Sequence, residues 1–342
     1  MENPRCDLIL LSWNSLEFTR PCVESLLAHT APPCRLIIVD QNSNRETQEY
    51  LRSVQSTPSV RVELIVNPKN LGFSEGMNVG LRQAAAPYAC FLNNDILLPP
   101  GWLEEMIAVL ESDPSIGSVC PASNTFDIHP APGGDWLALA RSRAGLSGRW
   151  MELPYGEAFC MLARTNLLRR LGGFDGQTYE QIYFEDNDLG RRVQAEGLSC
   201  VMAEGTYVWH HGGRSTRHHP ERDLLFRKNR ERYEARWGPE GPKTLYVLTC
   251  LDPETCGRAA VSARAEANRS GLAWILVPAG NTGQAWPRHI NIRIEQHRGL
   301  AFAWRITRRI LFKKKGFEVI CCDAGWLRRV LRFIHRAEVR PI

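Results

Sequence analysis

The sequence has no long hydrophobic run. Hydrophobic residues make up 44% of its 342 residues, yet no uninterrupted apolar stretch approaches the roughly 18 to 20 residues that a membrane-spanning helix needs. The stretch LILLSW near the start is short, and the preceding MENPRCD has neither the basic region nor the small-residue cleavage site of a signal peptide. We therefore expect a soluble globular protein with no membrane-spanning helix and no cleaved leader.

Paired cysteine motifs are also missing. The 11 cysteines are scattered, odd in number and never spaced as C-x-x-C. This distribution argues against a disulfide framework and against a zinc site. It predicts reduced thiols and a cytoplasmic location.

Acidic residues become scarce toward the end of the chain. Residues 244–342 contain 17 Lys and Arg against 7 Asp and Glu, a net charge of +10, whereas the other residues contain 25 and 30, a net charge of −5. The change falls near the stretch GPEGP at 238–242, which is typical of a linker. We therefore predict two domains, residues 1–240 and residues 244–342.

Strand and helix patterns alternate through the first domain. Short apolar runs typical of buried strands are followed by longer stretches with helical spacing. The predicted strands are residues 7–13, 35–40, 60–68 and 88–95, and the predicted helices are residues 15–30, 47–55 and 74–86. Such units predict an α/β fold with a mostly parallel sheet and helices on both faces.

Polar side chains stand at the ends of three predicted strands. They are Ser12-Trp13-Asn14, Asp40 and Asn93-Asn94-Asp95. Parallel α/β sheets bind ligands beyond the carboxyl ends of their strands. Asp95 is a hard oxygen ligand suited to Mg²⁺ or Mn²⁺, and such an ion would in turn hold a diphosphate. Taken alone, the sequence supports equally well an Asp95 that only caps the turn before PPGW.

Six motifs together carry a family resemblance. They are LLSWNSLEFTRPCVESL, IIVDQNSN, NPKNLGFSEGMNVGL, FLNNDILLPPGWLEEM, LARTNLLRRLGGFD and YFEDNDLGRRVQAEG, in this order. Over residues 5–237 or so, the chain resembles the family-2 glycosyltransferases, which are inverting enzymes with the GT-A fold. It looks most like the bacterial branch that includes rhamnosyltransferase-like enzymes of cell-surface polysaccharide synthesis.

The resemblance implies a role for each matching position. Ser12, Trp13, Asn14, Asn70, Gly72, Phe73, Asn78, Asn93 and Asn94 match positions around the nucleotide and the donor sugar. Asp40 matches the acidic residue that hydrogen-bonds the pyrimidine base. Because a carboxylate accepts the imide N–H of uracil or thymine, which cytosine lacks, a UDP- or dTDP-sugar donor is implied. The segment 93–95 occupies the position of the D-x-D metal motif, and Asp95 is its only carboxylate.

Three acids cluster in YFEDNDLGRRVQAEGL: Glu185, Asp186 and Asp188. The following apolar trace predicts that they begin a helix, where acids also serve as caps and complement the macrodipole. They match the family's E-D-x-D position, which implies a base that removes the acceptor hydroxyl proton. We favour Asp186, with Glu185 as the alternative, and expect Asp188 to orient the helix or loop.

A histidine pair lies in the Gly-rich stretch VWHHGGRST. In the family, a histidine here faces the metal or the diphosphate, and His210 matches best, with His211 as the alternative. Arg214 is expected to meet phosphate oxygens. The pair is also compatible with an ordinary surface loop. We expect acceptor specificity in residues 124–153, which match no motif.

The basic second domain reads as a smaller, Rossmann-like α/β unit. Its predicted strands are residues 244–250, 272–278 and 316–322, and its predicted helices are residues 257–271, 299–314 and 324–336. It faintly resembles the amino-terminal half of a GT-B glycosyltransferase. We expect a docking or dimerisation module, or a peripheral contact with an anionic membrane. No nucleic-acid recognition motif is present.

Two functions follow from the sequence. The first is an inverting, metal-dependent transferase that uses Mn²⁺ or Mg²⁺ and passes a sugar to a glycan, lipid-linked or protein acceptor. The second is a catalytically weak protein that keeps the fold for binding nucleotides or carbohydrates. The reduced D-x-D motif at 93–95 keeps the second alternative open, whereas the acidic cluster at 185–188 favours the first.

Overall fold

A computed structural model describes residues 3–132, 134–179, 181–212, 221–280, 285–299, 301, 316–334 and 336–342. The chain divides into two compact units. Unit 1 contains Met1–Met151 and Tyr155–Trp237, and unit 2 contains Glu152–Pro154 and Gly238–Ile342. Each unit is described by itself.

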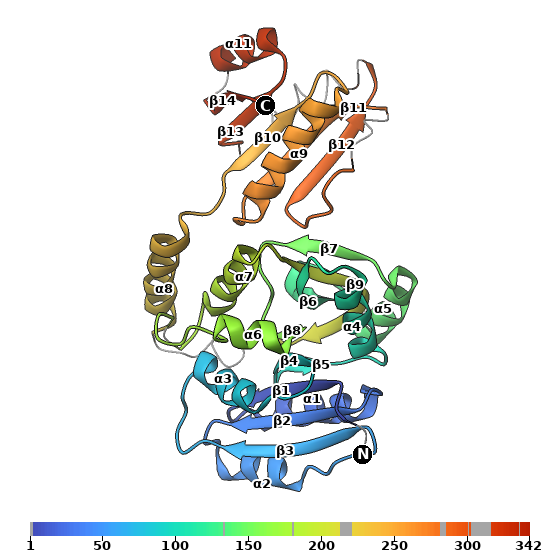
Figure 1. Cartoon of the computed structure of the whole chain (residues 1–342), viewed down its shortest axis with the longest axis vertical. Helices are drawn as coiled ribbons and strands as arrows, with labels where there is room; N and C mark the ends of the chain where they lie inside the picture. The colour runs from blue at the N-terminus through green and yellow to red at the C-terminus, as the bar shows by residue number, and fades with distance from the viewer. Residues whose placement is uncertain are drawn as a thin grey trace. The chain divides into compact units, whose positions relative to one another are not determined.

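Unit 1 is built on one mixed sheet with the strand order β3-β2-β1-β4-β8-β6-β9-β5, and β7 pairs with β9 (Figure 1). The strands are β1 (Cys6–Ser12), β2 (Cys34–Asp40), β3 (Val60–Val66), β4 (Tyr88–Asn93), β5 (Ile96–Leu97), β6 (Ile116–Ser123), β7 (Trp150–Leu153), β8 (Cys160–Arg164) and β9 (Ser199–His210). The pairs β3–β2, β2–β1, β1–β4 and β6–β9 are parallel, and β8 and β5 pair antiparallel to their neighbours.

The helices of unit 1 cover both faces of this sheet. They are α1 (Leu16–His29), α2 (Arg45–Ser53), α3 (Phe73–Gln83), α4 (Trp102–Ser112), α5 (Trp136–Arg143), α6 (Thr165–Leu171), α7 (Glu185–Ala195) and α8 (Arg222–Trp237), with short 3-10 helices η1 (Asn124–Phe126) and η2 (Ala144–Leu146). Side chains alternate along a strand. Leu8 therefore packs with Val23 of α1 in the main core, whereas Ile9 on the other face lies against Gly80 of α3.

The parallel register aligns the polar strand ends. Ser12 at the end of β1 pairs with Asp40 at the end of β2, and Leu11 pairs with Asn93 of β4. All three strands therefore end at one edge of the sheet. The predicted α/β class with a mostly parallel sheet is confirmed.

The antiparallel part of the sheet was not predicted from the sequence. Its strands β5 and β7 are short, and β9 continues through the polar end Trp209-His210. The pairing of β5 with β9 sets Ile96 opposite His210, and His211 N donates to Asp95 O at 2.9 Å. This pairing brings the two segments that carry the predicted metal ligands together.

Unit 2 contains a fully parallel sheet with the order β12-β11-β10-β13-β14. Its elements are β10 (Lys243–Val247), α9 (Pro253–Ala267), β11 (Leu272–Pro278), β12 (Ile292–His297), β13 (Val319–Cys322), α11 (Gly325–Ile334) and β14 (Glu338–Pro341). The second α/β unit is confirmed, although the sequence analysis missed the edge strands β12 and β14. Most of the helix predicted over 299–314 lies outside the described residues. Within the described ranges, no helix is both long and apolar enough to cross a membrane.

Candidate active site

A cavity of about 640 Å³ opens at the carboxyl edge of β1 and β4 and at the start of α7. Ten of the residues selected from the sequence line it. They are Trp13, Asn70, Gly72, Phe73, Asn93, Asn94, Asp95, Glu185, Asp186 and His210. The structure therefore brings the predicted donor, metal and catalytic positions to one place.

Three other selected residues hold the loops behind the cavity wall and do not line it. Asp40 is fully buried, and its carboxylate accepts the Ser43 amide at 3.2 Å. Asn14 bridges to the same turn, since its side-chain oxygen accepts the Asn44 amide at 2.7 Å. Ser12 is buried and accepts the Gln41 amide through its backbone oxygen at 2.9 Å. The neighbour Gln41, which the sequence analysis passed over, lines the cavity instead of Asp40.

Asn78, His211 and Arg214 are three more of the residues chosen from the sequence. Asn78 clamps the backbone of Phe174 with two hydrogen bonds of 2.8 and 2.9 Å, so it fixes the loop before α7 and does not line the cavity. His211 packs its ring against Phe18 and also lies outside the lining. Arg214 lies outside the described residues.

Gln41 holds the glycine-rich segment in place. Its amide nitrogen donates to Gly72 O at 2.6 Å, and its amide oxygen accepts from Asn67 at 2.8 Å. Gly72 has a φ of +81°, a conformation that favours glycine. A Cβ atom at Gly72 would lie 3.5 Å from the Cα of Gln181, which also lines the cavity. The glycine-rich segment and the loop before α7 are therefore in close contact.

Asp95 and His210 form a pair on the cavity wall. The Oδ1 atom of Asp95 lies 3.2 Å from Nε2 of His210, and both side chains are largely buried. The other ring nitrogen of His210 lies 3.1 Å from Oγ1 of Thr125, and the ring stacks on Phe159 with centroids 4.8 Å apart. Asn124 bonds the backbone N–H and C=O of His210 at 2.9 and 2.7 Å. The imidazole is therefore held in one orientation.

The pair fits a divalent ion of the kind that the motifs imply. A carboxylate oxygen and an imidazole nitrogen are ligands that Mn²⁺ accepts, and Mg²⁺ sites use one or two carboxylates together with substrate phosphates. Among the described residues, no group of three or more His, Cys, Asp or Glu side chains could hold a metal ion. Asp95 and His210 would therefore share the ion with oxygens of the bound diphosphate.

The acids of α7 stand at the end of a strained loop. Gln181, Tyr183 and Phe184 have φ values of 60°, 75° and 71°, a region that side chains other than glycine seldom adopt. Strain of this kind persists where the surrounding structure enforces it, as at active sites. Here the loop turns Glu185 and Asp186 into the cavity.

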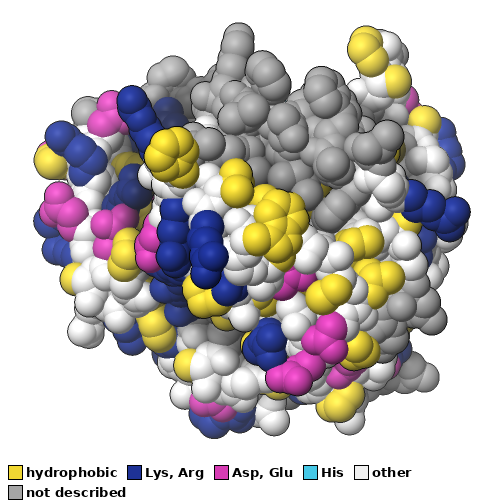
Figure 2. Space-filling view, turned by 90° about the horizontal axis from the view of Figure 1, so that it is seen from above, with side chains coloured by type: hydrophobic (Ala, Val, Ile, Leu, Met, Phe, Trp, Pro, Cys, Tyr) yellow, Lys and Arg dark blue, Asp and Glu magenta, His cyan; other side chains and the backbone are white. Residues whose placement is uncertain are grey.

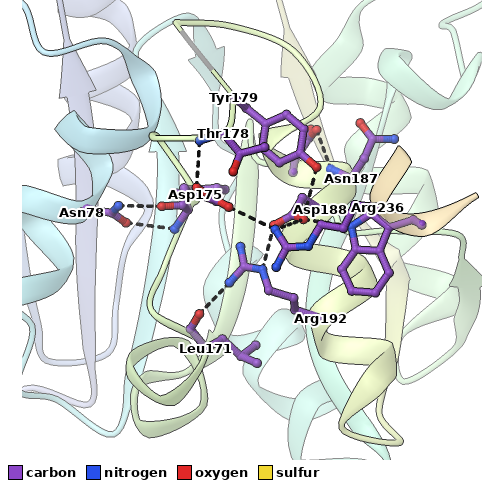
Figure 3. A network of polar contacts seen from close by, with 12 residues as sticks. Asn78, Leu171, Asp175, Thr178, Tyr179, Asn187, Asp188, Arg192 and Arg236 are labelled. Atoms are coloured by element: carbon purple, nitrogen blue, oxygen red, sulfur yellow. Dashed lines mark hydrogen bonds and ion pairs between the residues drawn. The ribbon is translucent and has the colours of Figure 1, made fainter. Parts of the chain in front are cut away.

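Asp188 belongs to a structural network and not to the cavity (Figure 3). It is fully buried, and its oxygens meet Arg192 at 2.7 Å, Arg236 at 3.0 Å and the indole N–H of Trp237 at 2.9 Å. Arg236 also pairs with Asp175 at 3.0 Å. The network fastens the first turn of α7 to the end of α8, which agrees with an orienting role for Asp188.

Glu157 is a cavity acid that the sequence analysis missed. It lies between β7 and β8, and Tyr155, two residues before it, packs on Gly190 of α7, where an added Cβ atom would overlap Tyr155. The Oε2 atom of Glu185 is buried without a partner among the described residues. In the sequence, Glu157 is a lone charged residue at the start of the apolar run 157–163, and this feature could have marked it as a candidate site residue.

The three acids do not ionise together. Burial, followed by the charge of Asp186, raises the pKa of Glu157 and of Glu185 to about 8. Burial also raises the pKa of Asp186, but backbone N–H groups, including that of Asn187 at 2.8 Å, stabilise its charged form. Burial therefore favours the neutral form of all three acids, and the backbone N–H groups around Asp186 favour its charged form over those of the two glutamates.

The chain is similar to known proteins in sequence and in structure. Residues 7–171 match the family model described as Glycosyl transferase family 2. The match places a family 2 glycosyltransferase domain over this stretch of unit 1. The resemblance drawn from the motifs is thereby confirmed, as is the GT-A type of α/β fold.

Two of the relatives are, by name, an O-antigen biosynthesis protein and a rhamnosyltransferase. The chain is 25% identical over 278 residues to the O-antigen biosynthesis protein RfbC of Myxococcus xanthus, covering 74% of this chain and 21% of that protein. It is 25% identical over 232 residues to the N-acetylglucosaminyl-diphospho-decaprenol L-rhamnosyltransferase of Mycobacterium tuberculosis, covering 58% of this chain and 74% of that protein. A crystal structure of S. aureus TarS in complex with UDP-GlcNAc aligns at a TM-score of 0.49 with 15% identity, covering 67% of this chain and 66% of that one.

The family 2 domain is one part of longer relatives. The chain spans 21% of RfbC and 28% of an uncharacterised protein of Sinorhizobium fredii, to which it is 24% identical over 257 residues. The second of these alignments covers 68% of this chain.

Proposed function

We propose that the cavity of unit 1 transfers a sugar, with inversion, from a nucleoside diphosphate to a hydroxyl group of an acceptor. The supporting observation is that Asp95 and Asp186 line the same cavity of a family 2 glycosyltransferase domain. The names of the relatives favour a role in the synthesis of a bacterial polysaccharide or glycoconjugate. The acceptor is then a glycan, lipid-linked or protein hydroxyl reached from the cytoplasm.

Asp186 is the proposed base. Its ionised carboxylate takes the proton of the acceptor hydroxyl while the hydroxyl oxygen attacks the anomeric carbon and the bond to the diphosphate breaks. Glu185 serves this role less well at neutral pH, because its pKa is raised to about 8 and it keeps its proton. A base and a leaving group on opposite sides of the sugar give inversion.

The residues around Asp95 receive the diphosphate. A bound Mn²⁺ or Mg²⁺, held by Asp95 and His210, would neutralise charge on the leaving group. Trp13, which is 45% exposed and lines the cavity, presents an aromatic face on which a base or sugar can stack. A UDP- or dTDP-sugar stays the proposed donor on the motif resemblance alone, because Asp40 is buried and its carboxylate accepts the amide of Ser43 in the turn at 41–44.

A donor panel tests the reaction. The purified chain is incubated with UDP-, dTDP- and GDP-sugars and Mn²⁺, and the release of nucleoside diphosphate is measured. We expect release from a UDP- or dTDP-sugar above the level of the GDP-sugars. Release from GDP-sugars alone would contradict the proposed donor. Tight nucleotide binding without release of any sugar would support the alternative of a binding protein.

Glu157 is proposed to take part as a neutral carboxylic acid. At neutral pH, its protonated carboxyl group donates a hydrogen bond to the acceptor beside Asp186. Glutamine keeps a donor of similar size without an ionisable proton, so Glu157→Gln is expected to retain turnover within a few-fold at neutral pH. Glu157→Ala removes the hydrogen-bond donor. We expect it to raise the KM for the acceptor roughly tenfold, which corresponds to the free energy of about one hydrogen bond.

The pH dependence of the free energy of unfolding tests, without any substrate, whether Glu157 is protonated at neutral pH. A glutamate ionises at a pKa of about 4.3 in the unfolded chain, whereas Glu157 keeps its proton up to about 8 in the fold. The parent therefore loses this contribution to its free energy of unfolding as pH rises from about 4.3 to about 8. Glu157→Gln should match the parent near the lower pH and exceed its stability increasingly toward the higher one. Urea unfolding across this range is the measurement, and a constant difference would show that Glu157 ionises normally.

A further inference from the structure

Helix α11 of unit 2 carries an unusual outward face. Trp326, Val330 and Phe333 follow the i, i+4, i+7 spacing of one helical stripe, and they are 67%, 46% and 92% exposed. Aromatic side chains bury large areas in stable proteins, so an exposed stripe of this kind marks a binding surface. Figure 2 shows exposed hydrophobic side chains beside Lys and Arg side chains on the face that it presents.

The inner face of α11 explains why the stripe points outward. Leu327 and Leu331 are buried, and they pack with Ile320 of β13 and Val339 of β14 in one core cluster. Arg328 donates to Cys322 O at 2.9 Å, which ties the start of the helix to the end of β13. The fold therefore holds α11 in a fixed orientation, and the exposed stripe cannot turn inward without loss of this core.

The charges around the stripe point to its partner. The helix contains no Asp or Glu. The exposed Arg329 and Arg332 lie on it, and the exposed Arg336 follows its end. Residues 244–342 carry a net charge of +10 in the sequence. A short amphipathic helix with Trp and Phe on one face and arginines at its flanks matches an interface of headgroups and acyl chains that bears negative charge.

We propose that the stripe Trp326, Val330 and Phe333, flanked by arginines, docks unit 2 on an anionic lipid surface. The aromatic side chains enter the boundary between headgroups and acyl chains, and the arginines pair with lipid phosphates. The contact is peripheral, since α11 lies along the surface. It does not depend on the activity of the cavity in unit 1.

Vesicle flotation with the full chain tests the docking. The probes are vesicles of phosphatidylcholine alone and of phosphatidylcholine mixed with phosphatidylglycerol. We expect the parent to float with the mixed vesicles at low salt, and to bind phosphatidylcholine alone more weakly. The variant Trp326→Ser/Phe333→Ser is expected to lose binding by roughly tenfold or more, because two large apolar groups no longer leave water.

Two further variants show whether a loss of vesicle binding comes from the stripe itself or from any substitution on the surface of unit 2. Val261→Ser removes a side chain that is 72% exposed on α9, outside the stripe, and should bind vesicles like the parent. Arg329→Glu should reduce binding to the mixed vesicles and leave binding to phosphatidylcholine alone unchanged, because it reverses one charge and keeps the apolar side chains of the stripe. Circular dichroism and thermal unfolding verify that each variant is folded.

Two results would overturn the proposal. The first is equal flotation of the parent and the Trp326→Ser/Phe333→Ser variant with the mixed vesicles. The second is a parent that does not bind vesicles but is dimeric by light scattering, with the double variant monomeric. In that case the stripe is an interface between copies of the chain.

Discussion

Replacing Asp186 with asparagine is expected to lower the rate of sugar transfer by roughly 100-fold or more, the usual scale for loss of a general base. Asparagine keeps the shape of the side chain but cannot take the acceptor proton. The affinity for the donor nucleotide should stay close to that of the parent, because the proposed diphosphate ligands lie on the segments of Asp95 and His210. Single-turnover kinetics and nucleotide titration measure the two quantities separately.

The matched control sits at the other end of the same helix. Glu196 caps α7 and forms an exposed ion pair with Arg170 at 3.1 Å, far along the helix from the cavity acids. Glu196→Gln should therefore transfer sugar at the parent rate. If Asp186→Asn also retains the parent rate while Glu185→Gln loses it, Glu185 is the base and the assignment made here is wrong.

Asp188 gives a contrasting result from the same motif. Its carboxylate is buried and contacts Arg192, Arg236 and Trp237, so Asp188→Asn removes both ion pairs and leaves the largely buried Arg192 with a weaker partner. We expect a lower melting temperature for this variant, whereas Asp186→Asn should not lower it, since burial already disfavours the charge of Asp186. Thermal unfolding of both variants separates the orienting acid from the reacting one.

The sequence predicted the parts of the site that stand on strand ends. Periodicity located β1, β2 and β4, and the rule for parallel sheets then placed Trp13 and Asp95 at one edge. The sequence could not distinguish a residue that faces the ligand from an adjacent residue that holds the loop in place. Asp40 and Gln41 are adjacent, and only the backbone geometry decides that Gln41 faces the cavity.

The rest of the site depends on contacts between distant segments. Glu157 and Asp186 line the same cavity although they come from separate segments, and Tyr155 packs closely on Gly190 of α7, a detail that no local pattern encodes. Asn124 likewise lies 86 positions from His210 yet fixes its backbone. Residues 124–153 had been predicted to select the acceptor, and that role stays a prediction.

Replacing Asp95 with alanine is expected to abolish the stimulation of nucleotide binding by Mn²⁺. Asp95 is the carboxylate of the segment 93–95, and its Oδ1 atom lies 3.2 Å from the imidazole of His210. Asn94 cannot replace it, because its side-chain nitrogen donates to Thr19 at 2.8 Å and an amide oxygen carries no charge. Titration calorimetry of UDP and dTDP, with and without Mn²⁺, measures the effect for the parent and the variant.

The two neighbouring histidines provide the variant and its control. His210→Ala should weaken the dependence on Mn²⁺, since the ring nitrogen that faces Asp95 is lost and Thr125 and Phe159 hold that ring in place. His211→Ala should leave the dependence unchanged, because His211 packs on Phe18 outside the cavity. Equal nucleotide affinity of the parent with and without Mn²⁺ would show that Asp95 holds no ion. The pair of Asp95 and His210 would then serve the fold alone, and the charge of the diphosphate would need another partner.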